Sequence, residues 1–158
     1  MTDRPTKISG PEIFTADPQT TAVIAAEVPI AELKDFFDAA FHAVADVLLR
    51  QGVAPQAAFG YYPKMPTETI ALEVGFITNS PITREGKVLP GELPGGQIAR
   101  ATYVGSYEGL EAAYGEFAEW IHAQGRAPGP AMWEVYVTEP TPDVDPGSMR
   151  TDLFWPLV

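Results

Sequence analysis

One carboxylate stands among aromatic residues in the short run MWEVYV, from Met132 to Val137. Successive side chains of a β-strand point to opposite faces, so this run predicts Glu134 and Tyr136 on the same face as Met132. Trp133 and the two valines are then expected on the other face, packed against helices. Charged residues are depleted from strand interiors. Glu134 therefore needs a partner or a function.

A carboxylate beside aromatic rings is suited to holding an organic cation. Neutralisation of its charge offsets the cost of desolvation, and each well-placed ring adds about 0.5–2 kcal/mol of cation–π energy. In the alternative interpretation, Glu134 is solvated at a sheet edge or pairs with an arginine such as Arg100. The residue types alone favour the binding role only slightly.

The secondary-structure elements that must position Glu134 occur twice in the chain. The pattern Gln-Gly-x-Ala-Pro occurs at 51–55 and again at 124–128. Each copy follows an amphipathic helix pattern, between Leu33 and Leu48 and between Leu110 and Ile121, with apolar residues three and four apart. One strand-like run precedes each helix and two follow it. The predicted strands are 20–28, 57–63 and 68–77 in the first unit, and 97–104, 131–139 and 150–157 in the second.

This duplication predicts an α+β fold made of two strand–helix–strand–strand repeats. Both helices are expected on one side of antiparallel sheet, with pseudo-twofold symmetry and a central ligand cleft. The Pro- and Gly-rich segment between the repeats is predicted to be a connector with room for a small hairpin. It is not predicted to be a domain boundary, because neither repeat could bury its helix alone. The expected organisation is a flexible N-terminus at 1–11 and a single domain at 12–158, with repeats at about 20–77 and 97–157 and the connector at 78–96.

The spacing of the repeat also predicts the lining of the cleft. At the offset of the pentapeptide, Glu134 corresponds to Tyr61 and Met132 corresponds to Phe59. These four residues and Tyr136 are expected to share one concave surface. Tyr103 and Trp155 are candidates to reach the same surface. The predicted ligand-binding set is Phe59, Tyr61, Met132, Glu134, Tyr136, Tyr103 and Trp155.

Composition excludes several classes of function. A formal charge of −11 with no Lys/Arg cluster argues against direct binding of nucleic acid. The chain has no cysteine, and its two histidines lack metal-ligand spacing, so no metal site is predicted. No phosphate-binding motif or other cofactor motif is present, and no cofactor is expected. The apolar runs are too short for a membrane span or a secretory signal, which predicts a cytoplasmic protein.

The ordered set of motifs resembles a known family. The duplicated unit, the segment LPGGQIARATYVGSYEGLEAAYGEFAEWI, the strand WEVYV and the closing MRTDLFWPL together look like the GyrI-like small-molecule-binding domain, over about Glu12 to Leu157. This is the effector-binding domain of AraC-type and MerR-type multidrug regulators. Few residues precede the matching segment, so we expect a stand-alone member and not a regulator with its own helix-turn-helix.

The resemblance implies a cleft between the repeats that accepts flat, hydrophobic, often cationic molecules, with Glu134 at the position of a buried glutamate that meets the cation. It also implies an alternative, because some free-standing members are hydrolases that open strained cyclopropane rings. In that case Glu134 would orient or deprotonate a water, and Tyr136 or Tyr103 would hydrogen-bond the leaving oxygen. A weaker alternative is a protein that binds and inhibits gyrase; beyond that, the sequence does not identify a protein partner.

Overall fold

Both helices follow directly from the apolar periodicity. The computed structural model describes residues 8–64, 68–105, 109–137 and 149–158. Helix α1 (Leu33–Gln51) follows a single 3-10 turn, and Gly52 ends it with a left-handed φ of 67°. Helix α2 (Leu110–Ala123) is followed by Gly125, whose φ is 74°. Both glycines belong to the repeated Gln-Gly-x-Ala-Pro pattern that follows each helix.

The described strands form one antiparallel sheet of eight strands. Its order is β1-β6-β8-β7-β3-β4-β2-β5. The strand bounds, in chain order, are β1 Ile8–Ala16, β2 Gln19–Pro29, β3 Pro55–Tyr62, β4 Thr69–Thr78, β5 Leu89–Leu93, β6 Gly96–Val104, β7 Met132–Tyr136 and β8 Arg150–Pro156. With two helices, the fold class is α+β, as predicted. The strands β3 and β7 meet at the centre, where Gly60 pairs with Glu134.

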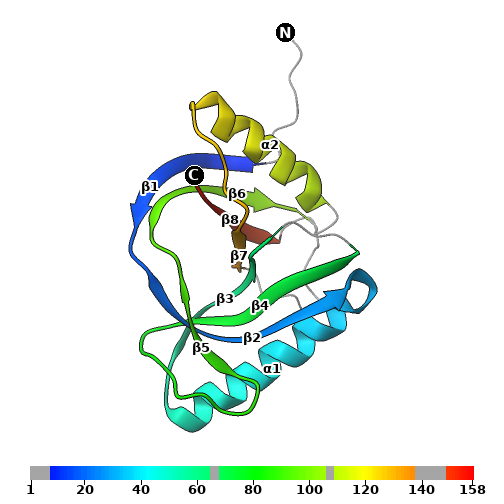
Figure 1. Ribbon diagram of the computed structural model, residues 1–158, viewed down its shortest axis with the longest axis vertical. Coiled ribbons are helices and arrows are strands. Elements are labelled where there is room, and N and C mark those ends of the chain that lie inside the picture. The colour runs from blue at the N-terminus through cyan, green and yellow to red at the C-terminus, as the bar shows by residue number, and fades with distance from the viewer. Residues whose placement is uncertain (1–7, 65–67, 106–108, 138–148) are drawn as a thin grey trace.

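Two very short connectors force this sheet to curl. Asp17 and Pro18 join β1 to β2, and Pro94 and Gly95 join β5 to β6, although each pair of strands stands six places apart in the sheet. In a flat sheet six strand spacings would separate them by about 29 Å. Three Cα–Cα steps reach only about 11 Å. The sheet therefore curls until both ends of the strand order approach each other, as Figure 1 shows.

The helices pack against one face of the curled sheet. Helix α1 lies against β2 and β4, and α2 lies against β1 and β6, at opposite ends of the molecule in Figure 1. Under α2 the core contains Phe117, Ile121 and Leu153, each with 0% exposure. Under α1 it contains Val44 and Val74, also with 0% exposure. Each helix thus buries its apolar stripe on its own half of the sheet.

The face away from the helices carries a separate apolar cluster. Phe59 and Trp133 lie at its centre and are nearly fully buried. Ile98 of β6 and Leu93 of β5 belong to the same cluster, although these strands are near opposite ends of the strand order. Burial on this face is possible because the sheet curls around it.

The structure adds two strands that the sequence analysis missed. Strand β1 begins at Ile8, inside the segment 1–11 that was expected to be loose, and residues 1–7 lie outside the described part of the chain. Strand β5 lies within the expected connector and pairs with β2. Pro11 and Pro90 interrupt the strand pattern in the sequence. Both strands form edges of the sheet, where a missing N–H group is tolerated.

The centre of β4 has no room for a side chain at Gly75. A Cβ atom there would lie 1.8 Å from the carbonyl oxygen of Ala22 on the neighbouring strand, so the backbone itself would have to move. We expect Gly75→Ala to lower the free energy of unfolding by about 3 kcal/mol. Urea denaturation would measure the change.

The matched control is Gly115→Ala, on the exposed side of α2, where a Cβ atom would meet nothing within 4 Å. This variant should gain up to about 1 kcal/mol from helix propensity. If both variants had the same denaturation midpoint, the close approach at Gly75 would be disproved.

Candidate functional site

Glu134 lies on the face of the sheet that packs against the helices. Its carboxylate accepts a hydrogen bond from Tyr114 of α2, and its neighbour Tyr136 contacts rings of α1. The sequence analysis had assigned the helix-packed face to Trp133 and Val135, and this was wrong: both belong to the apolar cluster on the opposite face. The alternation within β7 is as predicted, but the two faces are exchanged. Glu134 is therefore buried between sheet and helix, with 6% exposure.

Two tyrosine hydroxyls bind the two carboxylate oxygens of Glu134. Tyr114 donates to Oε2 at 2.7 Å, and Tyr136 donates to Oε1 at 2.8 Å. The hydroxyl of Tyr62 on β3 lies 3.4 Å from that of Tyr136 and extends the chain of polar groups. Among the described residues, no lysine, arginine or histidine forms an ion pair with Glu134. The carboxylate is therefore satisfied by hydrogen bonds, while its charge has no cationic partner in the described chain.

Burial dominates the electrostatics of this group. Removal from water raises the pKa of Glu134 above its usual value, and the hydrogen bonds from Tyr114 and Tyr136 partly oppose that shift. Burial also raises the pKa of both tyrosines well above the normal range, and the nearby carboxylate adds to this rise. Both hydroxyls hence remain protonated donors across the physiological range.

Aromatic rings from α1 cover the Tyr136 side of the site. Phe37 and Phe41 meet Tyr136 edge-on, with centroid distances of 5.9 and 6.2 Å. Gly60, opposite Glu134 on β3, makes this packing possible. A Cβ atom at Gly60 would lie 2.9 Å from the Tyr136 hydroxyl oxygen and 3.3 Å from the Phe37 ring. The site thus contains one carboxylate, a row of hydroxyls and a ring wall, contributed by both helices and the central strands.

Four of the predicted ligand-binding residues share this face with Glu134. Tyr136 contacts it directly. Met132, Tyr103 and Trp155 are buried in the apolar cluster under α2. The Trp155 indole donates to the carbonyl of Gly129 at 2.7 Å, and its ring lies 5.8 Å from that of Tyr114. Trp155 therefore supports the tyrosine that binds Glu134.

Phe59 and Tyr61 are placed on the opposite face. Phe59 has 1% exposure in the other apolar cluster, and the Tyr61 ring lies 6.4 Å from Trp133. The reason is a bulge between Pro55 and Ala57, where β3 gains one residue relative to β4. One extra residue exchanges the faces of every following side chain. The residue of β3 that belongs with Glu134 is consequently Tyr62.

Two further strand carboxylates lie on the face away from the helices. Asp152 accepts hydrogen bonds from Thr102 at 3.0 Å and from Arg150 at 3.2 Å. Arg100 lies 3.6 Å from Asp152 and is not the partner of Glu134. Glu73 is half-buried next to Tyr61, and burial raises its pKa. Within the described ranges, no group of three acidic or histidine side chains could hold a metal ion.

The sequence analysis missed the helix residues of the site. Tyr114, Phe37 and Phe41 fall within the two predicted amphipathic helix patterns, and they pack against the apolar clusters under those helices. A tyrosine in such a stripe carries a hydroxyl that needs a partner when buried. That requirement was the available signal for Tyr114. The signal for Phe37 and Phe41 was weaker, because nothing distinguishes a phenylalanine that lines a site from one that fills a core.

The buried carboxylate makes stability depend on pH. The pKa of Glu134 is raised in the folded state, so the cost of ionising it is absent below the ordinary value of 4.5. Between pH 4.5 and the raised pKa of the folded state, the unfolded state loses its proton first, so the stability of wild type falls as pH rises. We expect the free energy of unfolding of Glu134→Gln, relative to wild type, to increase over this interval and then level off. Urea denaturation at a series of pH values would show it, and a difference independent of pH would contradict the burial of an ionisable group.

No described helix combines the length and the apolar character needed to cross a membrane.

A search of curated proteins found no match to the chain. Among solved structures, the EcmrR C-terminal domain has a TM-score of 0.80 at 14% identity, covering 94% of this chain and 97% of that domain. The EcmrR chain in a complex with DNA also has a TM-score of 0.80, at 16% identity and 94% coverage of this chain. This chain covers 57% of the EcmrR chain in that complex.

Two other solved structures share the fold at 12% identity. A hydrolase from Listeria innocua has a TM-score of 0.69, covering 98% of this chain and 94% of that one. SAV2435, bound to tetraphenylphosphonium, has a TM-score of 0.66, covering 94% of each chain. In addition, the sequence model of the GyrI-like small molecule binding domain matches residues 10–158. The chain therefore belongs to the GyrI-like small-molecule-binding family.

Proposed function

We propose that this domain binds an aromatic organic cation between its two helices, with Glu134 as the counter-ion. The observation that carries the proposal is the buried carboxylate of Glu134, which is hydrogen-bonded by Tyr114 and Tyr136 but has no cationic partner among the described residues. Burial of a carboxylate costs free energy unless its charge is compensated. A cationic ligand supplies that compensation.

The surrounding rings support an aromatic ligand. Phe37, Phe41 and Tyr136 form contacts with one another next to the carboxylate. A cation close to such rings gains both cation–π energy and apolar burial. The presence of tetraphenylphosphonium in SAV2435, which shares this fold, agrees with a cation of this kind. Sensing or sequestration of such compounds is the role that we assign to the domain.

Binding requires a rearrangement at α2. Glu134 has 6% exposure, and the hydroxyl of Tyr114 occupies one of its oxygens. A cation that approaches Oε2 must displace this hydroxyl or share the oxygen with it. Tyr114 lies on α2, so the ligand replaces the hydrogen bond between α2 and Glu134 with its own contact to this carboxylate. We infer that α2 is the element that moves.

We also propose that the site lies between two pseudo-symmetric repeats. Outward from the centre of the sheet, the first half has the order β3-β4-β2-β5 and the second has β7-β8-β6-β1. The units β2-α1-β3-β4 and β6-α2-β7-β8 therefore occupy corresponding positions. Such an arrangement brings the two helices to either side of the central pair β3 and β7, on which Tyr62 and Glu134 lie.

A titration with a matched pair of probes tests the cation-binding role. Tetraphenylphosphonium carries a charge, and triphenylphosphine oxide is similar in its rings but neutral. We expect Glu134→Gln to weaken binding of the cation by at least about tenfold, equal to about 1.4 kcal/mol. Affinity for the neutral probe should not change. Isothermal titration calorimetry would measure both.

The control variant is Glu73→Gln, which neutralises a half-buried strand carboxylate on the other face of the sheet. It should bind both probes as wild type does. Equal affinity of wild type and Glu134→Gln for the cation would remove Glu134 as the counter-ion and overturn the proposal.

A hydrolase is the second candidate, because two hydroxyl groups flank the carboxylate. Glu134 could deprotonate a water molecule while Tyr136 donates to the leaving oxygen of an opened electrophilic ring. The similarity to the Listeria innocua hydrolase shows only a shared fold. Turnover separates the two roles: conversion of an excess of a cyclopropane-containing alkylating compound by wild type, lost in Glu134→Gln, would establish the enzyme. One equivalent of the compound bound and returned unchanged would establish the binder.

A further inference from the structure

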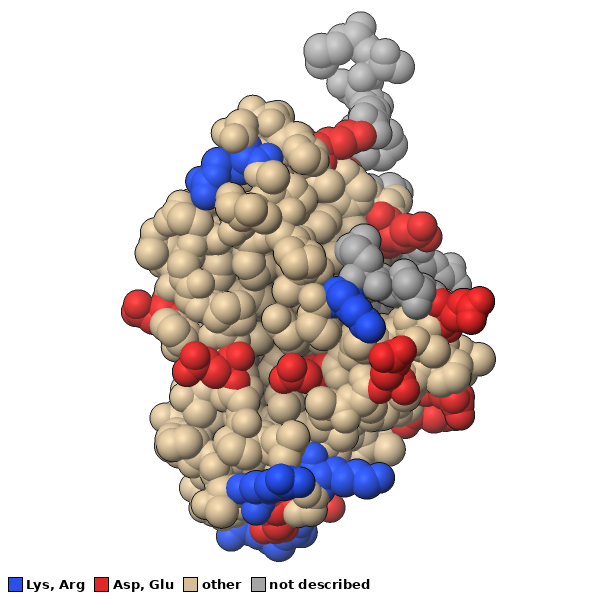
Figure 2. Space-filling view, viewed as in Figure 1, with Lys and Arg blue, Asp and Glu red and all other residues tan. Residues whose placement is uncertain are grey.

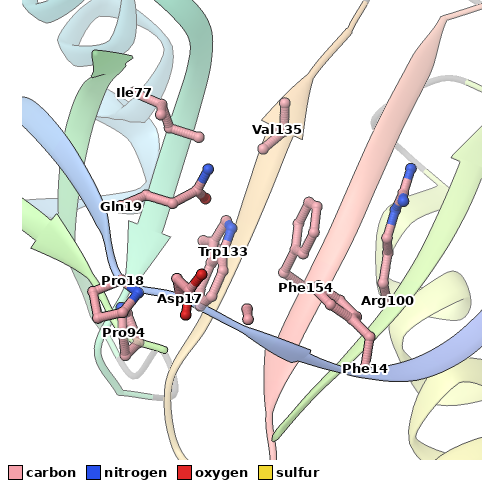
Figure 3. Close-up of a pocket in the computed structure, with 11 residues that line it drawn as sticks. Phe14, Asp17, Pro18, Gln19, Ile77, Pro94, Arg100, Trp133, Val135 and Phe154 are labelled. Carbon is pink, nitrogen blue, oxygen red and sulfur yellow. The ribbon is translucent and has the colours of Figure 1, made fainter. Parts of the chain in front are cut away.

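The face of the sheet away from the helices carries a groove that the proposed function does not use. Its volume is about 480 Å³, within the usual range for ligand sites of about 300–1,000 Å³. Side chains from six strands line it together with the two connectors that curl the sheet, around Pro18 and Pro94. Figure 3 shows the lining side chains between these segments.

The centre of the groove is aromatic. Trp133 and Phe154 stack with a centroid distance of 5.4 Å and an interplanar angle of 8°. Phe14 of β1 packs edge-on against Phe154 at 6.5 Å. Trp133 itself has 2% exposure, whereas Phe154 and Phe14 are half-buried and reachable. A ligand therefore reaches this cluster at Phe154 and Phe14, and these rings favour an aromatic partner.

A carboxylate stands on one side of these rings. Asp17 and Gln19 lie on the opposite side of Phe154 from Arg100 in Figure 3. Asp17 is exposed, and among the described residues it has no hydrogen-bond or ion-pair partner. This side of the groove therefore favours a ligand group that donates hydrogen bonds or carries positive charge.

A loosely held guanidinium stands on the other side. Arg100 lies over Phe154 at 5.8 Å, and its nitrogens are 3.6 Å from carboxylate oxygens of both Glu12 and Asp152. These distances exceed those of hydrogen bonds, and within the described ranges Arg100 forms none with its side chain. A guanidinium has five N–H donors. This side of the groove consequently offers donors to a carboxylate.

We propose that the groove is a second binding site, for a planar aromatic zwitterion with an ammonium group at one end and a carboxylate at the other. The ring system packs against Phe14 and against the part of Phe154 that Trp133 and Arg100 leave uncovered, the ammonium group meets Asp17 and the carboxylate meets Arg100. The net charge of −11 repels a simple aromatic anion but not a ligand whose own charges cancel. Figure 2 shows acidic side chains scattered over the visible surface, in agreement with a field that acts on any anion.

Fluorine NMR can locate the ligand because the chain has three tryptophans. Trp133 lies in the groove, whereas Trp155 lies next to Tyr114 on the helix face. The protein is labelled with fluorotryptophan and titrated with 6-(aminomethyl)-2-naphthoate, with its methyl ester as the cation-only probe and 6-methyl-2-naphthoate as the anion-only probe. We expect the zwitterion to shift the Trp133 resonance saturably, to leave that of Trp155 in place, and to bind more tightly than either single-charge probe.

Two variants assign the site. Asp17→Asn should weaken the zwitterion up to about fivefold, the effect of an exposed ion pair, and should not weaken the anion-only probe. Glu134→Gln should leave affinity for the zwitterion unchanged, which makes this test independent of the proposed function. A shift of Trp155 without Trp133, no shift with any probe, or equal affinity of the three probes would each overturn the proposal.

Discussion

The curl of the sheet depends on two connections that are too short to cross a flat one. Asp17–Pro18 and Pro94–Gly95 each join strands six places apart, so the sheet must bend until its ends meet. This constraint creates the two environments described above. The inner surface closes on Trp133 and Phe154, while the outer surface has room for one helix on each half.

Glu134 links the helices to the centre of the sheet. It lies on the central strand β7, and its bonds to Tyr114 and Tyr136 connect α2, the sheet and, through the phenylalanine rings, α1. A hydrogen bond to a charged group contributes about 1.5–3 kcal/mol, and burial of the charge costs a similar or larger amount. The two hydrogen bonds therefore offset only part of the cost of burial, in agreement with the raised pKa of Glu134. Additional positive charge at this position would stabilise the carboxylate.

The sequence predicted the helices and six of the eight described strands, and it singled out Glu134 as a strand carboxylate that needs a partner or a function. These features depend on local periodicity and on one residue of unexpected type, and both are visible in a single chain. The face that Glu134 occupies was not predictable, since alternation fixes which residues share a face but not which face meets the helices. Tyr61 was chosen in place of Tyr62 because a bulge at Pro55 to Ala57 leaves no mark in the residue types. The edge strands were missed because Pro11 and Pro90 resemble turn residues.

The central pairing of β3 with β7 also has a consequence for synthesis on the ribosome. Tyr62 ends β3 and Met132 begins β7, so the first strand emerges roughly 70 residues before its partner. At translation rates of about 5–20 residues per second, β3 waits several seconds with an open edge. An unpaired edge of this kind can recruit strands from other chains. Acidic residues outnumber basic ones in the chain, so nascent copies repel one another while this edge is open.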